Sequence, residues 1–383
     1  MRRFYFDHNA TTPVSPEVLE AIVPVIAEVY GNASSIHYFG QQAKLRLDEA
    51  RRQVAALLGA NPKEIVFASG GTEAGNLAIL GVARRSGRSG RHVVTTTIEH
   101  PAVLNACAQL EREGVDVTYV RVGSSGVVDP EDIRRALGPE TMLVSVMHAN
   151  NEIGTIQPLR EIAALVHENG ALLHSDGVQA AGKIPSGVRE LGVDLYSISA
   201  HKIYAPKGIG ALYVREGVEL TPVLFGGHHE RDRRAGTENV PGAVALGCAA
   251  EWMITHQSEM ALLAALRDHI ETAVLDRVPG ARVNCAGSPR VPNTTNIAFE
   301  GIDSEPLLIA LDLRGYAVSS GSACSSGASE PSHVLKAIGL SREQARSSLR
   351  ISVGRFNAID QAEGLVDALE TCAAKLRRIS VHA

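Results

Sequence analysis

The sequence is poor in the features that mark several large classes of protein. Aromatic residues make up 4% of its 383 residues, the five cysteines form no C-x-x-C pair, and the formal net charge is only −5. The odd cysteine count argues against a disulfide framework and favours a reducing compartment. No apolar run is long enough to span a membrane, and the start, MRRFYFDHNATTP, lacks the apolar stretch of a signal peptide. We therefore expect a cytoplasmic protein without a membrane partner, and the charge balance predicts no direct contact with nucleic acid.

What is present is typical of an α/β protein of two or three domains. Hydrophobic residues make up 45% and charged residues 21%. Amphipathic patterns predict helices at 41–58, which Gly59 ends, and at 158–169. Short, continuously apolar runs predict buried strands between helical segments, at 65–68, 93–97, 142–147, 171–174 and 194–199. Such alternation predicts a mostly parallel sheet that helices cover on both faces.

The rhythm of the elements changes near residue 250. One long helical stretch is predicted from about residue 244 to 278, and an α+β pattern follows, with strands at 295–299, 316–318 and 349–353, a helix at 304–313 and a final helix. We therefore predict a large domain over residues 15–255 and a small α+β domain built from residues 1–14 and 256–383.

Polar residues stand just past the carboxyl end of each predicted strand of the large domain. Ligands of open α/β sheets bind at this edge. Acids, amides, a histidine and a lysine at separate strand ends therefore predict one composite site. In chain order these residues are Ser69, Gly70, Gly71, Thr72 and Glu73, then Glu99 and His100, Asn150, Asn151 and Glu152, Asp176 and Gln179, and His201 and Lys202.

Three of these features together favour pyridoxal phosphate. The turn 69–72 offers backbone N–H groups and hydroxyls to a phosphate, although alone it is more typical of a plain capped turn. Asp176 is either a turn residue or a carboxylate that keeps a ring nitrogen protonated. Lys202 lies among small and apolar residues, where burial would lower its pKa and free the amine for a Schiff base. A phosphate cup, an acid and such a lysine are what this cofactor needs.

Three other residues each allow a structural and a functional interpretation. His100 is either a capping or core histidine, or a flat ring that stacks on a cofactor and moves protons. Cys324 is surrounded by Ser, Gly and Ala, which favours an accessible nucleophile over a buried structural thiol. Arg350 is either an ion-paired strand residue or a bidentate clamp for a substrate carboxylate.

Taken together, these segments resemble the group I, NifS/IscS-type cysteine desulfurases of the class V aminotransferase family. The likeness covers nearly the whole chain and is carried by the motifs DHNATT, SGGTEAGN, TTTIEHPAV, VMHANNEIGTIQP, HSDGVQAAGKIP, SISAHKIYAPKGIG, RRAGTEN and SSGSACSSGASEPSHVL. The last motif is the most specific, because related transaminases lack this serine-rich cysteine loop. The resemblance implies a fold-type I pyridoxal-phosphate-dependent transferase, with a seven-stranded type of sheet in the large domain and the cysteine loop in the small one.

The resemblance also implies roles for individual residues. Lys202 holds the cofactor covalently, Asp176 pairs with its ring nitrogen, and His100 stacks over the ring. Asn151 and Gln179 bind the ring oxygen or the substrate carboxylate, and Arg350 binds that carboxylate. Cys324 becomes a persulfide. The phosphate ligands are Gly71, Thr72, Ser199 and His201, with Thr237 reaching the phosphate of the neighbouring subunit.

In this interpretation the protein is a homodimer that converts L-cysteine to L-alanine. Its persulfide passes to a sulfur acceptor or scaffold protein for iron–sulfur cluster assembly or thiolation. Among the departures from the family pattern, His8 replaces an asparagine, and His229 and Asp232 occupy positions where other residues are frequent. The resemblance assigns no role to His8.

Two alternatives stay open at this point. A selenocysteine lyase or a small-amino-acid aminotransferase would use the same fold and cofactor. A non-catalytic metal or sulfur carrier would be built on His228, His229 and Cys324, but no spacing supplies the three or four ligands that a metal site needs, so we predict no metal.

Overall fold

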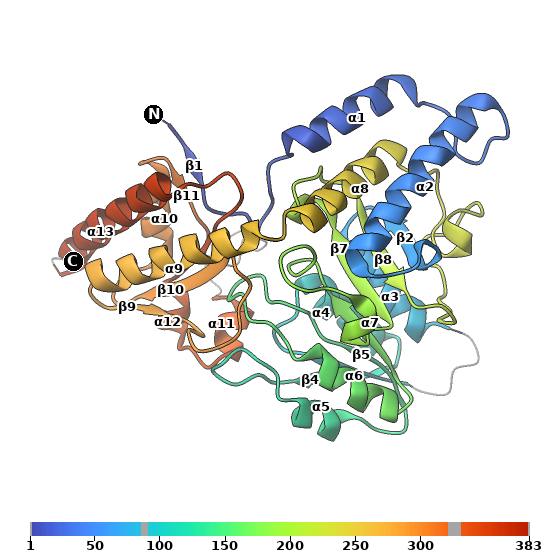
Figure 1. The fold of residues 1–383 in the computed structure, drawn as a ribbon. Coiled ribbons are helices and arrows are strands. Elements are labelled where there is room, and N and C mark those ends of the chain that lie inside the picture. The colour runs from blue at the N-terminus through green and yellow to red at the C-terminus, as the bar shows by residue number, and fades with distance from the viewer. Residues whose placement is uncertain (1, 86–90, 321–330, 382–383) are drawn as a thin grey trace.

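A seven-stranded sheet forms the centre of the larger lobe in the computed structural model, which describes residues 2–85, 91–320 and 331–381 (Figure 1). The strand order is β2-β8-β7-β6-β5-β3-β4, and only β8 runs against its neighbours. The strands are β2 (Ile65–Ala68), β3 (His92–Thr96), β4 (Asp116–Val120), β5 (Thr141–Ser145), β6 (Leu172–Asp176), β7 (Leu195–Ser199) and β8 (Gly210–Val214). The predicted α/β class with a mostly parallel sheet is confirmed.

The sequence patterns missed two strands of this sheet. β4 lies at the edge and is only partly buried, so its sequence, DVTYV, lacks the apolar run by which the other strands were recognised. β8 is fully buried but begins at a glycine, directly after the glycine-rich stretch that follows Lys202. Both strands are stabilised by pairing with neighbouring strands, and the pattern of a single segment does not reveal such pairing.

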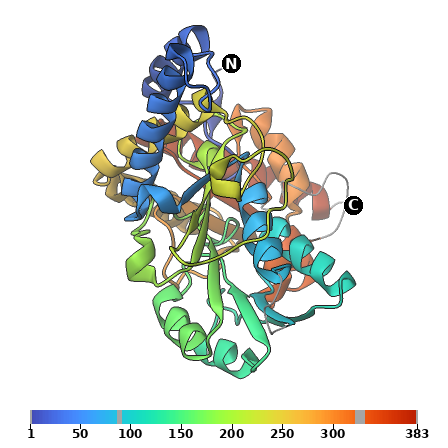
Figure 2. The same ribbon diagram turned by 90° about the vertical axis from the view of Figure 1, so that its right-hand side faces the viewer.

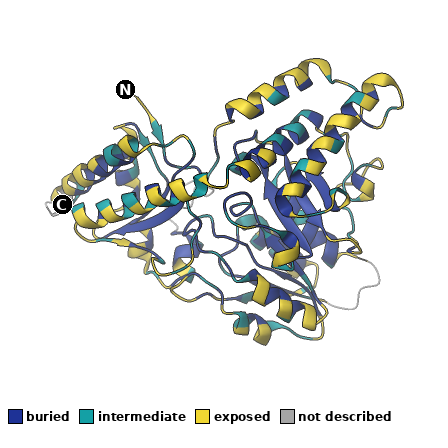
Figure 3. Cartoon of the chain, in the orientation of Figure 1, coloured by how far each residue is buried: buried dark blue, intermediate teal, exposed yellow. Residues whose placement is uncertain are grey.

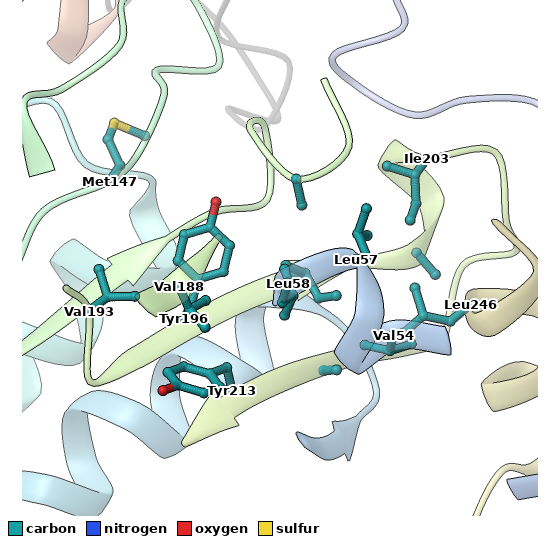
Figure 4. Close-up of a cluster of buried hydrophobic side chains, with 14 of the residues drawn as sticks. Val54, Leu57, Leu58, Met147, Val188, Val193, Tyr196, Ile203, Tyr213 and Leu246 are labelled. Carbon is teal, nitrogen blue, oxygen red and sulfur yellow. The ribbon is translucent and has the colours of Figure 1, made fainter. Parts of the chain in front are cut away.

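Helices cover both faces of the sheet, as two perpendicular views show (Figure 2). α2 ends where predicted, because Gly59 adopts a left-handed φ of 62° and caps it. Val54, Leu57 and Leu58 of α2 meet Leu246 of α8 and the sheet residues Tyr196 and Tyr213 (Figure 4). The helices of this lobe are α1 (Pro16–Glu28), α2 (Tyr38–Leu58), α3 (Gly71–Ala83), α4 (Pro101–Arg112), α5 (Pro130–Ala136), α6 (Leu159–Glu168), α7 (Val188–Leu191) and α8 (Val240–Thr255).

The second lobe has its own sheets and its own hydrophobic core. Antiparallel strands in the order β12-β10-β9 form one sheet, and β1 pairs in parallel with β11. Phe6, Ile270, Ile297 and Leu369 lie in this core. The elements are β1 (Phe4–Tyr5), α9 (Glu259–Arg277), β9 (Ala281–Val283), β10 (Thr294–Phe299), α10 (Ser304–Asp312), β11 (Tyr316–Ala317), α11 (His333–Ala337), α12 (Arg342–Arg346), β12 (Ser348–Ser352) and α13 (Ile359–Val381).

The long helix predicted over residues 244–278 is two helices. α8 ends at Thr255 and α9 begins at Glu259, and His256 stacks on Trp252 at the break. The division into domains at residue 255 stays a prediction. Four residues beyond that point, Val334, Leu335, Ile338 and Ala345, pack into the core of the larger lobe.

Large apolar side chains are exposed along α1 and at the start of α2, where the burial view shows long exposed stretches (Figure 3). Ile26 is 62% exposed, Tyr30 72% and Ile36 94%. An apolar surface of this kind is typical of a face that another protein covers. None of the described helices is both long and apolar enough to cross a membrane.

Candidate active site

A cavity of about 680 Å³ opens at the carboxyl ends of the central strands. This volume lies within the range of pockets that hold a cofactor together with a small substrate. The predicted site residues that line it are Gly71, Thr72, His100, Asn151, Asp176, Gln179, Ser199, His201, Lys202 and Arg350. Thr237 is exposed and does not line the cavity, and Cys324 lies outside the described residues.

One end of the cavity is suited to an anion. α3 begins at Gly71, and Gly70, which precedes it, supplies no side chain to cap the first N–H groups. A Cβ at Gly71 would lie 2.7 Å from Cγ2 of Val178, so a larger residue would push into the wall. Gly71, Thr72, Ser199 and His201 all line the cavity, so the N–H groups of the first helical turn and these side chains offer donors to an anion there.

Asp176 ends β6 as a partly buried carboxylate that lines the cavity. Burial raises its pKa, and the cationic forms of His100 and Lys202 and the N–H of Val178 work against this effect. The N–H of Val178 donates to Oδ1 at 3.0 Å. A carboxylate that lines an open cavity, with the Lys202 ammonium as the nearby cation near neutral pH, is arranged to accept a further positively charged donor.

His100 combines the two interpretations that its sequence allowed. It caps α4, because its Nδ1 accepts the N–H of Ala102 at 3.1 Å, and it also lines the cavity. A neutral ring with Nδ1 as acceptor carries its proton on Nε2. Burial lowers the pKa of His100, which keeps the ring neutral near pH 7.

Lys202 lies in the short 3-10 helix η2 (Ala200–Lys202), directly after β7. Its Nζ donates to the carbonyl oxygens of Asn9 at 2.5 Å and Ala10 at 2.7 Å. These carbonyls belong to the N-terminal segment, so the start of the chain forms part of the site. The amine lies within the cavity that Asp176 and His100 also line.

Arg350 crosses from β12 of the smaller lobe into the cavity and is 2% exposed. Its Nη2 donates to Oδ1 of Asp7 at 2.6 Å, and its Nη1 donates to the carbonyl of Asn151 at 3.0 Å. Its Nε makes no hydrogen bond within the described part of the chain. The arginine is therefore ion-paired, as one interpretation required, and it also lines the cavity, as the other required.

Sequence reasoning missed Asn9, Ser332 and His333 as lining residues. Asn9 lies in the DHNATT motif, but its role depends on contacts with Lys202 and Gln179 that a single segment cannot reveal. Ser332 caps α11 and donates to Oε2 of Glu152 at 2.6 Å. Nε2 of His333 donates to the carbonyl of Glu99 at 2.9 Å.

The segment before Thr237 is a strained turn. Glu230, Arg231 and Asp232 all have φ between 46° and 63°, the left-handed region that side chains disfavour. Glu230 holds the turn, because its carboxylate receives both Arg51 donors at 2.7 Å in a buried ion pair. His228 and Asp232 bond to each other at 2.5 Å. Two residues are too few for a metal site. Among the described residues, no cluster of three or more His, Cys, Asp or Glu could bind a metal ion.

Comparison with known proteins identifies the family. The class-V aminotransferase model matches residues 4–365. A cysteine desulfurase of Nostoc sp. is 48% identical over 99% of this chain and 95% of its own length. A cysteine desulfurase IscS of Dictyoglomus turgidum is 46% identical over 100% and 97%. The chain is a cysteine desulfurase of the class-V aminotransferase family.

Solved structures of this family share the fold. A NifS-like protein superimposes with a TM-score of 0.92 at 38% identity, over 98% of this chain and 100% of the other. SspA in complex with cysteine gives a TM-score of 0.82 at 36% identity, over 92% and 99%. Cysteine desulfurases depend on pyridoxal phosphate, and the buried acid, the amine and the uncapped helix start of this cavity fit that cofactor.

Proposed function

We propose that this desulfurase takes the sulfur of L-cysteine onto Cys324 and releases L-alanine, with pyridoxal phosphate held by Lys202. The observation that supports this proposal is that Asp176, His100, Lys202 and Arg350 line one cavity although they come from distant parts of the sequence. Each supplies a different function: an acid, a proton carrier, an amine and a carboxylate clamp.

Bound pyridoxal phosphate supplies an electron sink that weakens bonds at the carbon atoms of an attached amino acid. Asp176 would pair with its ring nitrogen, His100 would lie against the ring, and Gln179 and Asn151 would bind the ring oxygen or the substrate. Thr72, Ser199, His201 and the N–H groups that begin at Gly71 would hold the phosphate. Lys202 would anchor the aldehyde and then carry protons, because its amine lies beside the same cavity.

The sulfur step needs a thiolate and a held substrate. Arg350 would fix the carboxylate of cysteine, so that its sulfur faces Cys324. The Cys324 thiolate attacks that sulfur, the new S–S bond forms as the carbon–sulfur bond breaks, and the carbon keeps the electron pair and takes a proton to give alanine. Because the nucleophile must be ionised, activity is expected to fall in acid.

The site is proposed to be completed in a homodimer. Thr237 is exposed outside the cavity of its own chain, so its hydroxyl is accessible to a second copy. The exposed apolar side chains of α1 and the start of α2 supply a surface that a second copy would bury. The strained turn held by Glu230 and Arg51 fixes the segment that leads to Thr237.

The persulfide is proposed to pass to an acceptor or scaffold protein in the cytoplasm. Iron–sulfur cluster assembly and thiolation begin with the same group, and the relative from Dictyoglomus turgidum carries the name IscS.

Two variants test the function. Lys202→Ala is expected to lose the visible absorbance of the bound cofactor, while Lys207→Ala, an exposed lysine nearby, keeps it. Cys324→Ala is expected to keep that absorbance and to form no alanine from cysteine, whereas Cys248→Ala stays active. An unchanged spectrum for Lys202→Ala or full turnover by Cys324→Ala contradicts the proposal. A keto acid in place of alanine and sulfide would identify an aminotransferase.

A further inference from the structure

A second lysine lies behind the wall of the active-site cavity. Lys183 is 8% exposed, follows β6 in the turn that carries Gln179, and does not line the cavity itself. The proposed reaction assigns no role to Lys183. A buried lysine is costly unless its ammonium group is bonded, so its partner is informative.

That partner is Gln179. Nζ of Lys183 donates to Oε1 of Gln179 at 3.0 Å, and Nε2 of Gln179 donates to the carbonyl of Asn9 at 2.9 Å. An ammonium group only donates and a carbonyl only accepts, so the two contacts fix which end of the amide carries the NH₂ group. Without Lys183, only the carbonyl of Asn9 would hold the amide in this orientation, and the oxygen of Gln179 would lose its donor.

The same network reaches the cofactor lysine. The carbonyl of Asn9 that receives Gln179 also receives Nζ of Lys202 at 2.5 Å. Lys183 and Lys202 face a second cavity of about 10 Å³, together with His8 and Asn293. This volume is close to the minimum that holds one water molecule. Nδ1 of His8 is buried and has no hydrogen-bond partner among the described residues.

We propose that Lys183 is a positioning residue that fixes the Gln179 amide with its NH₂ group toward the cofactor site and sets the charge behind Lys202. This inference rests on the proposed function, because it takes Gln179 as a ligand of the cofactor's ring oxygen. In this arrangement His8, which departs from the family pattern, is a neutral residue that lines the small cavity together with Lys183 and Lys202.

The charge of Lys183 depends on its surroundings. Burial, with smaller contributions from the cations Lys202 and Arg350, lowers its pKa to about 7. Lys183 in turn lowers the pKa of His8 and of His201. Near neutral pH the amine is therefore close to titrating, while His8, whose pKa burial lowers to about 4, stays uncharged.

The test is Lys183→Met in the holoenzyme, with the exposed Lys63→Met as matched control. Met253, Met260 and Leu263 line the small cavity, so a methionine suits the space. We expect the pH at which the cofactor's visible absorbance changes to rise by about one unit, because a cation and an oriented donor are lost. We expect kcat to fall about tenfold, and Lys63→Met to change neither.

The double variant separates positioning from mere packing. If Lys183 acts through Gln179, Lys183→Met has little further effect on kcat in a Gln179→Ala background. Equal losses in both backgrounds, or an unchanged pH titration in Lys183→Met, would overturn the inference. Lys183→Gln, which keeps a donor, should retain more of kcat than Lys183→Met and serves if the methionine variant does not fold.

The same spectra keep the two proposals apart. If Gln179→Ala shifts the cofactor titration and Lys183→Met does not, the positioning role fails and the proposed function stands. If the natural protein shows no cofactor absorbance, or if Lys202→Ala shows the same absorbance as the natural protein, the proposed function itself fails.

Discussion

The wall of the active-site cavity and the layer of side chains behind it both contain buried titratable groups, but the two regions surround those groups differently. Asp176 in the wall has the ammonium group of Lys202 and the neutral ring of His100 close by, and open space in front of it. Behind the wall, Glu99 and His174 are enclosed by neutral partners: Thr96 and Met147 bond to Glu99, and two serines bond to His174.

Burial is the largest cause of the pKa shifts in the rear layer, and the Asp176 carboxylate adds to it at Glu99. The pKa of Glu99 is raised to about 8 and the pKa of His174 is lowered to about 3. Both are therefore neutral near pH 7, and neither reaches the cavity. A shifted pKa is thus common to both regions, and what distinguishes the site is opposite charges that face a shared open space.

The largest effect is expected from removing the charge of the wall. Asp176→Asn keeps the shape of the side chain but cannot pair as an anion with a protonated ring nitrogen. We expect kcat/KM to fall by about 100-fold or more, the loss typical of removing one preorganised electrostatic contact. Steady-state kinetics with L-cysteine and the cofactor spectrum measure it.

Asp194→Asn is the matched control for this charge. Asp194 is a buried carboxylate just before β7, at the opposite end of the sheet, where it pairs with Arg215 at 2.7 Å. This variant should lower the melting temperature and keep kcat. If kcat/KM fell equally in both variants, the loss could be ascribed to removing any buried acid of the sheet. Such a result would contradict the distinction between the two regions.

Arg350→Lys should give the next largest effect. Lysine keeps the charge but loses the planar fork with which Arg350 binds Asp7 and the carbonyl of Asn151. We expect KM for cysteine to rise about tenfold with a smaller change in kcat. Arg346→Lys, at an exposed ion pair in the same lobe, is the control, and an unchanged KM in Arg350→Lys would argue against a carboxylate clamp.

Glu99→Gln tests the rear layer through stability. The folded state holds a proton on Glu99 that the unfolded chain releases above its ordinary pKa of 4.5, so stability falls as pH rises from 4.5 to about 8. Glutamine keeps the acceptor for Thr96 and Met147 and does not ionise. We expect the apo-protein to gain about 2 kcal/mol in the free energy of unfolding at pH 8, with no gain near pH 4.

Denaturant melts of both proteins across this pH range measure the effect. A variant that is no more stable than the natural protein at pH 8 would show that Glu99 ionises without cost, and that the rear layer is not kept neutral by burial.

The smallest effect is expected at His174. Its folded pKa of about 3 lies below the ordinary value of 6.5, so its contribution to stability is present above pH 6.5 and is lost as pH falls toward 3. His174→Asn cannot titrate, and its free energy of unfolding should fall less steeply in acid, by about 1 kcal/mol per pH unit. Urea melts between pH 4 and 7 give the two slopes, and parallel slopes would contradict the prediction.

Most of the candidate site could be predicted because parallel strands share one edge. Asp176, His100 and Lys202 each follow a strand, and a parallel sheet brings such positions together whatever the details of the loops. Thr237 shows the limit of this reasoning, since its motif is clear but it lies outside the cavity of its own chain. The single helix predicted over 244–278 was wrong: α8 ends at Thr255 and α9 begins at Glu259, although the segment between them contains no glycine or proline to signal the break.

The sequence by itself determined the class of fold, the strand ends that carry polar residues and the family, because these depend on local periodicity and on motifs within one segment. Only the tertiary structure decided that carbonyls of Asn9 and Ala10 receive Lys202, that Lys183 orients Gln179, and that Arg350 enters from the other lobe. Such contacts join side chains to partners set by packing, often across most of the chain length. No local pattern encodes them, because burial and orientation arise only when the whole chain is folded.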